Sequence, residues 1–147
     1  MRFALLLSAA LLSQGALAAM PEVEVFKSPY CGCCSKWTEH LRASGFAVKE
    51  TLTENVPAAR KRLGMPDRFG SCHTAKVGRY VIEGHVPAAD IKTLLRKNPK
   101  AIGLAAPGMP QASPGMDMPN AKPFDVLLID ANGRESVFST FTPKNGV

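Results

Sequence analysis

The stretch Tyr30-Cys31-Gly32-Cys33-Cys34-Ser35-Lys36-Trp37 holds three of the four cysteines of this 147-residue chain within four consecutive positions. The fourth lies much later, in Ser71-Cys72-His73-Thr74. A free cysteine packs as a small hydrophobic residue and needs no neighbours of its own kind. The clustering therefore indicates a thiolate site.

The residues on either side of this motif predict a strand and a helix. Residues 22–26 alternate polar and apolar side chains, as in a half-buried strand, and Pro29 follows them. From Cys33 or Cys34 to Ser44 the apolar positions follow a helical stripe, which ends at Gly45. The three cysteines are therefore predicted to lie in the loop and first turn of a helix.

Further along, the spacing of apolar residues and of Gly and Pro predicts a regular succession of elements. We expect a strand at 46–53, a helix at 56–63, strands at 72–77 and 80–83 joined by a two-residue turn, and a helix at 87–96. Residues 105–123 are too rich in Pro and Gly for regular structure and predict a loop. Residues 124–130 and 135–141 predict a β-hairpin that extends the sheet or folds over it.

The resulting order, β-α-β-α-β-β-α, resembles that of the thioredoxin fold over residues 22–97. The cysteine motif lies between the first strand and the first helix, where that superfamily carries its Cys-x-x-Cys. The resemblance implies that the residues just before the third strand, usually with a cis-proline, pack against the motif. Here that place is taken by Ser71-Cys72-His73, without a proline. This departure counts against thioredoxin-type substrate binding and would bring Cys72 to the other three sulfurs.

The N-terminus has the pattern of a secretory signal peptide. A positive start at Arg2 precedes an apolar run at 4–12 and the cleavage pattern Ala16-Leu17-Ala18. The run is shorter than the roughly 20 residues that a spanning helix needs. We therefore predict a signal peptide at residues 1–19, a single domain at residues 20–147, periplasmic localisation, and no membrane insertion after cleavage.

Composition narrows the class of protein. The chain is 46% hydrophobic, enough for one folded core, and has 18 Lys and Arg against 12 Asp and Glu. The basic residues are dispersed, with one run at residues 60–62 on a predicted helix. Such a pattern is typical of a solvated face and, together with export, counts against nucleic-acid binding.

Two uses of the cysteine motif follow from its place at a helix N-terminus, where the thiolate is stabilised over the thiol. In a thiol-disulfide oxidoreductase, Cys31 would attack and Cys34 would resolve. The extra thiols of Cys33 and Cys72 would interfere with such a pair, and they favour metal binding. Three ligands from one short turn would strain a single zinc site, whereas bridging thiolates suit several Cu(I) ions.

An oxidising compartment also permits a purely structural use of the thiols. Of the three ways to pair four cysteines, only Cys31 with Cys34 and Cys33 with Cys72 avoids bonds between residues too close in sequence. A small exported domain stapled by two disulfides is therefore a third hypothesis.

Methionine and histidine side chains add candidate ligands of lower rank. Met109, Met116 and Met118 lie in the predicted loop, where they either cover a hydrophobic patch or offer thioethers to Cu(I). His73 is a candidate ligand because it neighbours Cys72. We interpret His40 and His85 as structural or solvated, and Trp37 as a core residue.

Four motifs of this sequence resemble the CopG-type periplasmic copper-resistance proteins. They are Ser28-Pro29-Tyr30-Cys31-Gly32-Cys33-Cys34, Ser71-Cys72-His73-Thr74-Ala75, the stretch at 80–91, and Gly103-Leu104-Ala105-Ala106-Pro107-Gly108-Met109-Pro110 with Ser113-Pro114-Gly115-Met116. The resemblance implies a thioredoxin-like copper protein with a suggested oxidoreductase role in copper detoxification. By motif, the copper cluster would be held by Cys31, Cys33, Cys34 and Cys72.

Taken together, the sequence predicts a periplasmic copper-binding protein that holds Cu(I) in a multi-cysteine thiolate cluster for copper resistance or homeostasis. Its partners would be copper ions and other periplasmic copper-handling proteins. Whether it is an enzyme, as a copper oxidoreductase, stays open. The alternative is a thiol-disulfide oxidoreductase that uses Cys31 and Cys34.

Overall fold

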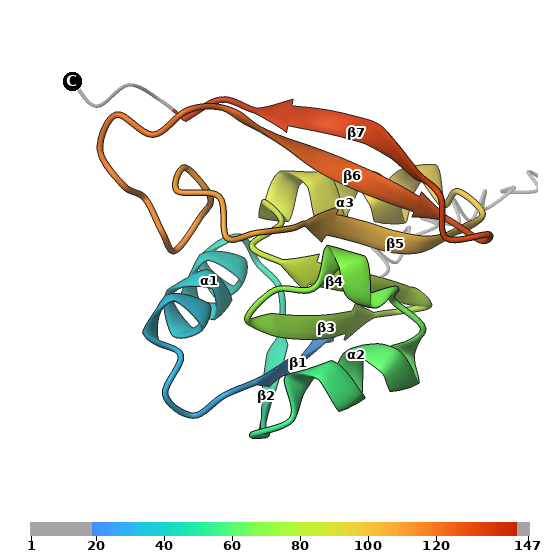
Figure 1. Cartoon of the computed structure of the whole chain (residues 1–147), viewed down its shortest axis with the longest axis horizontal. Coiled ribbons are helices and arrows are strands. Elements are labelled where there is room, and N and C mark those ends of the chain that lie inside the picture. Colours follow the sequence, from blue (N-terminus) through green and yellow to red (C-terminus); the bar gives the residue numbers. More distant parts are fainter. Residues whose placement is uncertain (1–18, 144–147) are drawn as a thin grey trace, which may run out of the picture.

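The computed structural model describes residues 19–143, and the predicted signal peptide lies, except for Ala19, outside the described residues. The order β-α-β-α-β-β-α predicted from the sequence is confirmed, with a short 3-10 helix inserted before the third strand and three strands added after α3 (Figure 1). The elements are β1 Val23–Lys27, α1 Gly32–Ala43, β2 Val48–Leu52, α2 Val56–Leu63, η1 Asp67–Phe69, β3 His73–Val77, β4 Tyr80–Gly84, α3 Ala88–Lys97, β5 Ala101–Ala106, β6 Phe124–Asp130 and β7 Glu135–Phe141.

All seven strands form one mixed sheet in the order β2-β1-β3-β4-β5-β6-β7. Strand β1 pairs in parallel with β2 and antiparallel with β3, and β4 pairs in parallel with β5. The hairpin of β6 and β7 pairs antiparallel with β5 at the far edge (Figure 1). Of the two placements predicted for this hairpin, extension of the sheet is therefore the one found.

Strand β5 corrects the sequence prediction, which assigned no strand here and began a loop at residue 105. Its sequence Ala-Ile-Gly-Leu-Ala-Ala lacks the alternation of large apolar and polar residues that identifies a half-buried strand. The reason lies in its neighbour β4: a Cβ at Gly103 would stand only 1.7 Å from the carbonyl oxygen of Val81. Small residues let the two buried strands approach, and they also hide the strand from pattern analysis.

Helix α1 forms because its buried side chains recur on one face, at Cys34, Trp37, Thr38 and Leu41. It ends at Ala43, with Ser44 as its C-cap, and the chain reverses at Gly45 with φ of +92°, a conformation that favours glycine. Trp37 is fully buried, as predicted, and its Nε1 donates to the carbonyl oxygen of Val86 at 2.9 Å. The bond ties α1 to the segment that follows β4.

The core has two parts, one on each face of the sheet. Residues of α1 and α3 share one cluster, whereas the segment after α2 packs on the other face. The neighbours Val81 and Ile82 belong to different clusters, as expected for successive side chains of a strand. In residues 19–143 no helix has the length and apolar character required to cross a membrane.

Candidate metal centre

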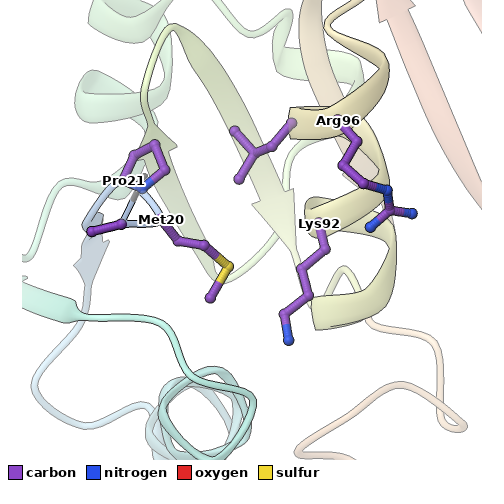
Figure 2. A pocket seen from close by; sticks show the side chains of 6 residues that line it. Met20, Pro21, Lys92 and Arg96 are labelled. Carbon is purple, nitrogen blue, oxygen red and sulfur yellow. The ribbon is translucent and has the colours of Figure 1, made fainter. Parts of the chain in front are cut away.

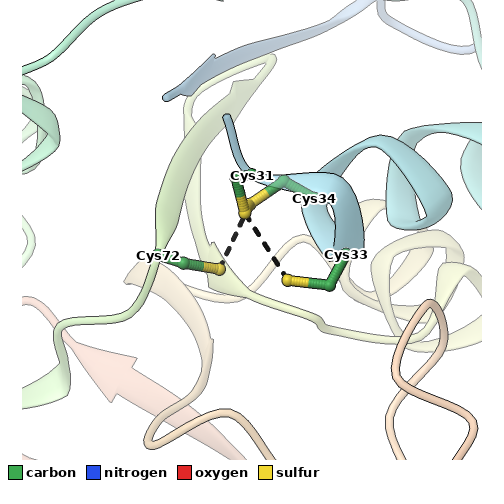
Figure 3. A group of neighbouring side chains, drawn as sticks. All are labelled: Cys31, Cys33, Cys34 and Cys72. Carbon is green, nitrogen blue, oxygen red and sulfur yellow. Dashed lines mark hydrogen bonds between the residues drawn. A yellow bond between two sulfur atoms is a disulfide. The ribbon is translucent and has the colours of Figure 1, made fainter. Parts of the chain in front are cut away.

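Three cysteines lie at the N-terminus of α1, as the sequence predicted. Cys31 is the last residue before the helix, in extended conformation, and Cys33 and Cys34 belong to its first turn. Cys34 is fully buried, while Cys31 and Cys33 are half-buried. Cys31 and Cys34 form a disulfide (Figure 3). Of the two bonds that a doubly stapled domain would have, the second is absent among the described residues, because Cys33 and Cys72 are free.

Cys72 reaches the same place from the other side, from the loop that leads into β3. Its Sγ lies 3.2 Å from Sγ of Cys34, and Sγ of Cys33 lies 3.5 Å from Sγ of Cys31 (Figure 3). The four sulfur atoms all lie within 4.8 Å of one another. The structure thus brings together the four residues that the sequence singled out as metal ligands.

Two histidines extend this group of sulfurs. His73 begins β3, His85 directly follows β4, and both are fully buried. Sγ of Cys72 lies 3.6 Å from Nδ1 of His73 and 3.7 Å from Nε2 of His85. Cys34, Cys72, His73 and His85 form a second set of donor atoms within 4.8 Å of one another. His73, a candidate ligand because it follows Cys72 in sequence, thus also has a ring nitrogen close to the sulfur of Cys72.

His85 is the residue that sequence reasoning missed, since it was interpreted as structural or solvated. Strands β3 and β4 pair with Thr74 opposite Glu83, and that register, extended by two residues, sets Cys72 opposite His85. The two-residue turn Gly78-Arg79 fixes the register of this hairpin. That turn was the available signal for a contact between Cys72 and His85.

The hydrogen bond of His85 determines which ring nitrogen faces the sulfurs. Its Nδ1 lies 2.8 Å from the carbonyl oxygen of Pro114, which can only accept, so Nδ1 carries the proton. Burial lowers the pKa of His85, which favours the neutral ring. The lone pair of Nε2 therefore points toward Cys72, as in a metal-ligating histidine oriented by a backbone carbonyl.

Burial sets the protonation states of two more groups. It lowers the pKa of His73 to about 3, with a smaller contribution from His85, so the ring is neutral. Burial, and next the adjacent Cys33, raises the pKa of Cys72 to about 12. In the metal-free protein Cys72 therefore keeps its proton, and a metal ion that binds there must displace it.

A buried ion pair holds the segment that carries Cys72. Nε of Arg60 donates to Oε1 of Glu83 at 2.9 Å, and both side chains are buried. The same carboxylate oxygen accepts from the backbone N–H and the hydroxyl of Ser71, and Arg60 also donates to the carbonyl oxygen of Ser71. Ser71, next to Cys72, is therefore fixed by three hydrogen bonds to buried charged groups.

A second buried cation lies under the first turn of α1. Lys27 is 3% exposed, and its Nζ donates to Oγ of Ser35 at 3.0 Å and lies 3.5 Å from Oε2 of Glu50. Ser35 directly follows Cys34 in sequence. The buried ammonium group of Lys27 thus ties the first turn of α1 to β1 and β2.

The methionine-rich loop is seated on the cysteine helix. Gly115 has φ of +90°, and a Cβ there would come within 2.8 Å of the carbonyl oxygen of Cys33 and of the backbone nitrogen of Trp37. Met109 and Met116 are half-buried, and Met118 is 50% exposed. Met109 adopts φ of +55°, uncommon for a residue with a side chain. The loop thus lies against α1, and thioether ligation stays a prediction.

A surface pocket elsewhere offers none of this chemistry. It encloses about 610 Å³ between the start of the described chain and α3 (Figure 2). The residues that line it are Ala19, Met20, Pro21, Lys92, Leu95 and Arg96. None of them is a thiol or an imidazole, so the candidate site remains the cysteine cluster.

The chain is similar to known proteins in sequence and in structure. A family model described as a protein of unknown function, DUF411, matches residues 69–116, which include Cys72 and the part of the loop up to Met116. No curated protein matches the chain. Two solved structures match it, both of copper resistance protein CopG: form 2 at 38% identity and TM-score 0.78, and form 1 at 39% identity and TM-score 0.77.

The match extends over nearly the whole of these relatives. It covers 84% of this chain for form 2 and 85% for form 1, and 99% of the relative in both cases. Such identity over such a length reaches beyond a shared fold to a shared family. The chain therefore belongs to the CopG family of copper resistance proteins.

Proposed function

We propose that this protein binds Cu(I) in a thiolate cluster and thereby serves copper resistance. The observation that carries the proposal is the pair of overlapping donor sets: four sulfurs within 4.8 Å, and a second set in which Cys34 and Cys72 join His73 and His85. Thiolates and neutral imidazoles are ligands that suit Cu(I). Because two sulfurs belong to both sets, they could bridge more than one ion.

The disulfide makes copper binding depend on reduction. In the structure Cys31 and Cys34 are bonded to each other, and only Cys33 and Cys72 are free thiols. Two electrons and two protons convert the bond into two more thiols. The reduced protein is therefore the form that we expect to bind Cu(I).

The same couple supports a role in copper redox chemistry. Oxidation of the Cys31 and Cys34 thiols to a disulfide releases two electrons and two protons, enough to reduce two Cu(II) ions to Cu(I). The contacts of the remaining sulfurs with this disulfide support the idea that product Cu(I) would be retained nearby. Such a protein would act as a copper oxidoreductase.

The proposal also covers the fold around the site, the methionines of the loop and the cellular compartment. A thioredoxin-like module would comprise β1 to α3, supported by the strand order β2-β1-β3-β4 with β3 antiparallel to its neighbours. Thioethers of the loop, at Met109, Met116 and Met118, would receive copper first, supported by the seating of Gly115 on α1. The domain of residues 20–147 would work in the periplasm after removal of residues 1–19, and exchange copper with other proteins there.

The test is a Cu(I) titration of the metal-free protein under anaerobic conditions, after reduction and again with the disulfide intact. The reduced protein should saturate above one Cu(I) per chain and show thiolate-to-copper absorption in the ultraviolet. The disulfide form, which is a control of identical sequence, should bind less. Equal uptake by both forms, or none by the reduced form, contradicts the proposal.

A second candidate function is thiol-disulfide oxidoreduction, favoured by the observed disulfide at a helix N-terminus. Cys31 is partly accessible while Cys34 is fully buried, as an attacking and a resolving cysteine should be. This function requires that Cys31→Ser abolish dithiol-dependent reduction of a small disulfide and that Cys33→Ser retain it. Loss in both variants would instead indicate a site that works as one cluster.

A further inference from the structure

The four sulfurs form a compact cluster in which each free thiol contacts the disulfide. Sγ of Cys33 contacts Sγ of Cys31 at 3.5 Å, Cys31 is bonded to Cys34, and Sγ of Cys34 contacts Sγ of Cys72 at 3.2 Å (Figure 3). Each free thiol thus touches a different sulfur of the bond. A thiol held against a disulfide sulfur is arranged for thiol-disulfide exchange, in which a thiolate attacks one sulfur and the other leaves.

We propose that the disulfide moves within the cluster, from Cys31–Cys34 to Cys34–Cys72, and that its position decides which sulfurs are open to copper. In this step the thiol of Cys72 gives up its proton as its sulfur attacks Sγ of Cys34. The bond between Cys34 and Cys72 forms, the bond between Cys31 and Cys34 breaks, and Cys31 leaves as a thiolate that takes up a proton. The step is an isomerisation, so no external oxidant or reductant is consumed.

His85 lies beside the thiol of Cys72 and limits the positions that its sulfur can take. Its Nε2 lies 3.7 Å from Sγ of Cys72, and its Nδ1 donates to the carbonyl oxygen of Pro114 at 2.8 Å. The carbonyl orients the ring and leaves the lone pair of Nε2 toward the thiol. The proton that Cys72 loses in the exchange passes to the departing Cys31 or to solvent.

The geometry favours Cys72 over Cys33 as the attacking residue. Exchange by Cys33 would produce a bond between Cys31 and Cys33, which only Gly32 separates, and such short spacings strain a disulfide. Cys34 and Cys72 come from different elements and face one another. The hydrogen bonds of Ser71 to Glu83 further fix the segment that carries Cys72.

The consequence for copper rests on the proposed function. With the bond between Cys31 and Cys34, the free thiols are Cys33 and Cys72. After exchange they would be Cys31 and Cys33, both half-buried on α1. The buried donor set with the two histidines would then have lost both of its sulfurs. The move would therefore shift copper binding from the buried side of the cluster to its outer side.

The exchange can be followed without copper, because the tryptic peptides separate the two bonds. Cleavage after Lys27, Lys36, Arg68 and Lys76 gives peptide 28–36, with three cysteines, and peptide 69–76, with Cys72. A bond between Cys31 and Cys34 stays within peptide 28–36, whereas one between Cys34 and Cys72 joins the two peptides. Metal-free reduced protein would be oxidised with one equivalent of diamide at pH 7.5, quenched in acid at intervals, alkylated with N-ethylmaleimide and analysed by mass spectrometry.

The Cys33→Ser variant gives the clearest result, since only three sulfurs remain. The joined peptides should appear as the internal bond disappears, with N-ethylmaleimide on Cys31.

Two results would overturn the proposal. One is a bond that stays within peptide 28–36 for a day in both the wild type and the Cys33→Ser variant, with circular dichroism showing that both are folded. The other is an alkylated Cys34 in the joined peptides, which would place the bond on Cys31. Because no copper is present, either result leaves the copper titration to decide the proposed function separately.

Discussion

The two halves of the cysteine cluster are built in different ways. The helix half consists of Cys31, Cys33 and Cys34, which follow one another at the start of α1 and lie partly at the surface. The strand half consists of Cys72, His73 and His85, which lie at the open end of the β3–β4 hairpin, away from its turn, and whose histidines are fully buried. One half is local in sequence, and the other exists only when β3 and β4 pair.

This difference assigns separate tasks to the halves. Buried polar groups are costly unless each has its partner, and the strand half is backed by the ion pair of Arg60 and Glu83. The helix half is held differently: Trp37 and Leu41 anchor α1 in the core, and Lys27, paired with the partly exposed Glu50, bonds to Ser35 in the first turn. We infer that the stability of the protein depends more on the strand half and its ion pair than on the cysteines of the helix half.

The largest effect is expected from Glu83→Ala, which leaves Arg60 buried without its partner. Removal of one member of a buried ion pair costs about 3–5 kcal/mol of unfolding free energy. Urea unfolding of the metal-free protein measures this change. The matched control is Glu24→Ala, which breaks the exposed pair with Lys49 and should cost at most about 1 kcal/mol. Similar losses in both variants would show that the strand half has no special support.

The second largest effect is expected on Cu(I) affinity, which should fall more when a cysteine of the strand half is replaced than when one of the helix half is. Cys72 belongs to both donor sets, whereas Cys33 belongs only to the set of four sulfurs. Cys72→Ser should therefore weaken Cu(I) binding to the reduced protein by about 100-fold, or about 2.7 kcal/mol, and Cys33→Ser by about tenfold. Competition with a Cu(I) chelator measures both. A greater loss in Cys33→Ser would make the helix half the principal copper site.

The helix half was predictable because its signals are local. The spacing of Cys33, Trp37 and Leu41 predicts the helix, and a cysteine at a helix N-terminus has a physical reason to be there. Cys72 and His73 were identified as candidates by their residue types. His85 was not, because its role depends on the register of β3 and β4, which places it opposite Cys72. Contacts of this kind belong to tertiary structure.

The prediction of the sheet was limited in the same way, because it also relied on local patterns in the sequence. The spacing predicted β1 to β4 and the terminal hairpin, whose strands have clear patterns of alternation or burial. Strand β5 was missed because its glycine and alanines serve the close approach of β4. The position of the loop could not be predicted from its composition either. A stretch rich in Pro and Gly does not indicate that Gly115 packs on the backbone of Cys33.

The contact of the loop with the helix half can be tested at Gly115. Gly115→Ala introduces a Cβ within 2.8 Å of two backbone atoms at a φ of +90°, and overpacking of this kind costs about 1–3 kcal/mol. The matched control is Gly108→Ala, at φ of +74° with no atom within 4 Å of the added Cβ. Its cost should be limited to the backbone conformation, about 1 kcal/mol. If chemical denaturation gives the same loss for both, the loop is not seated on α1 in solution.

The smallest effect concerns the pH dependence of the metal-free protein and returns to the strand half. Burial lowers the pKa of His73 from 6.5 to about 3, so below pH 6.5 the unfolded chain binds a proton that the folded chain does not. The unfolding free energy should therefore fall as the pH decreases, by about 1 kcal/mol between pH 7 and 5.5 for this residue. The lowered pKa values of His85 and His40 add losses of the same sign. His73→Gln should reduce the slope, and an unchanged slope would mean that His73 is charged or solvated in the folded protein.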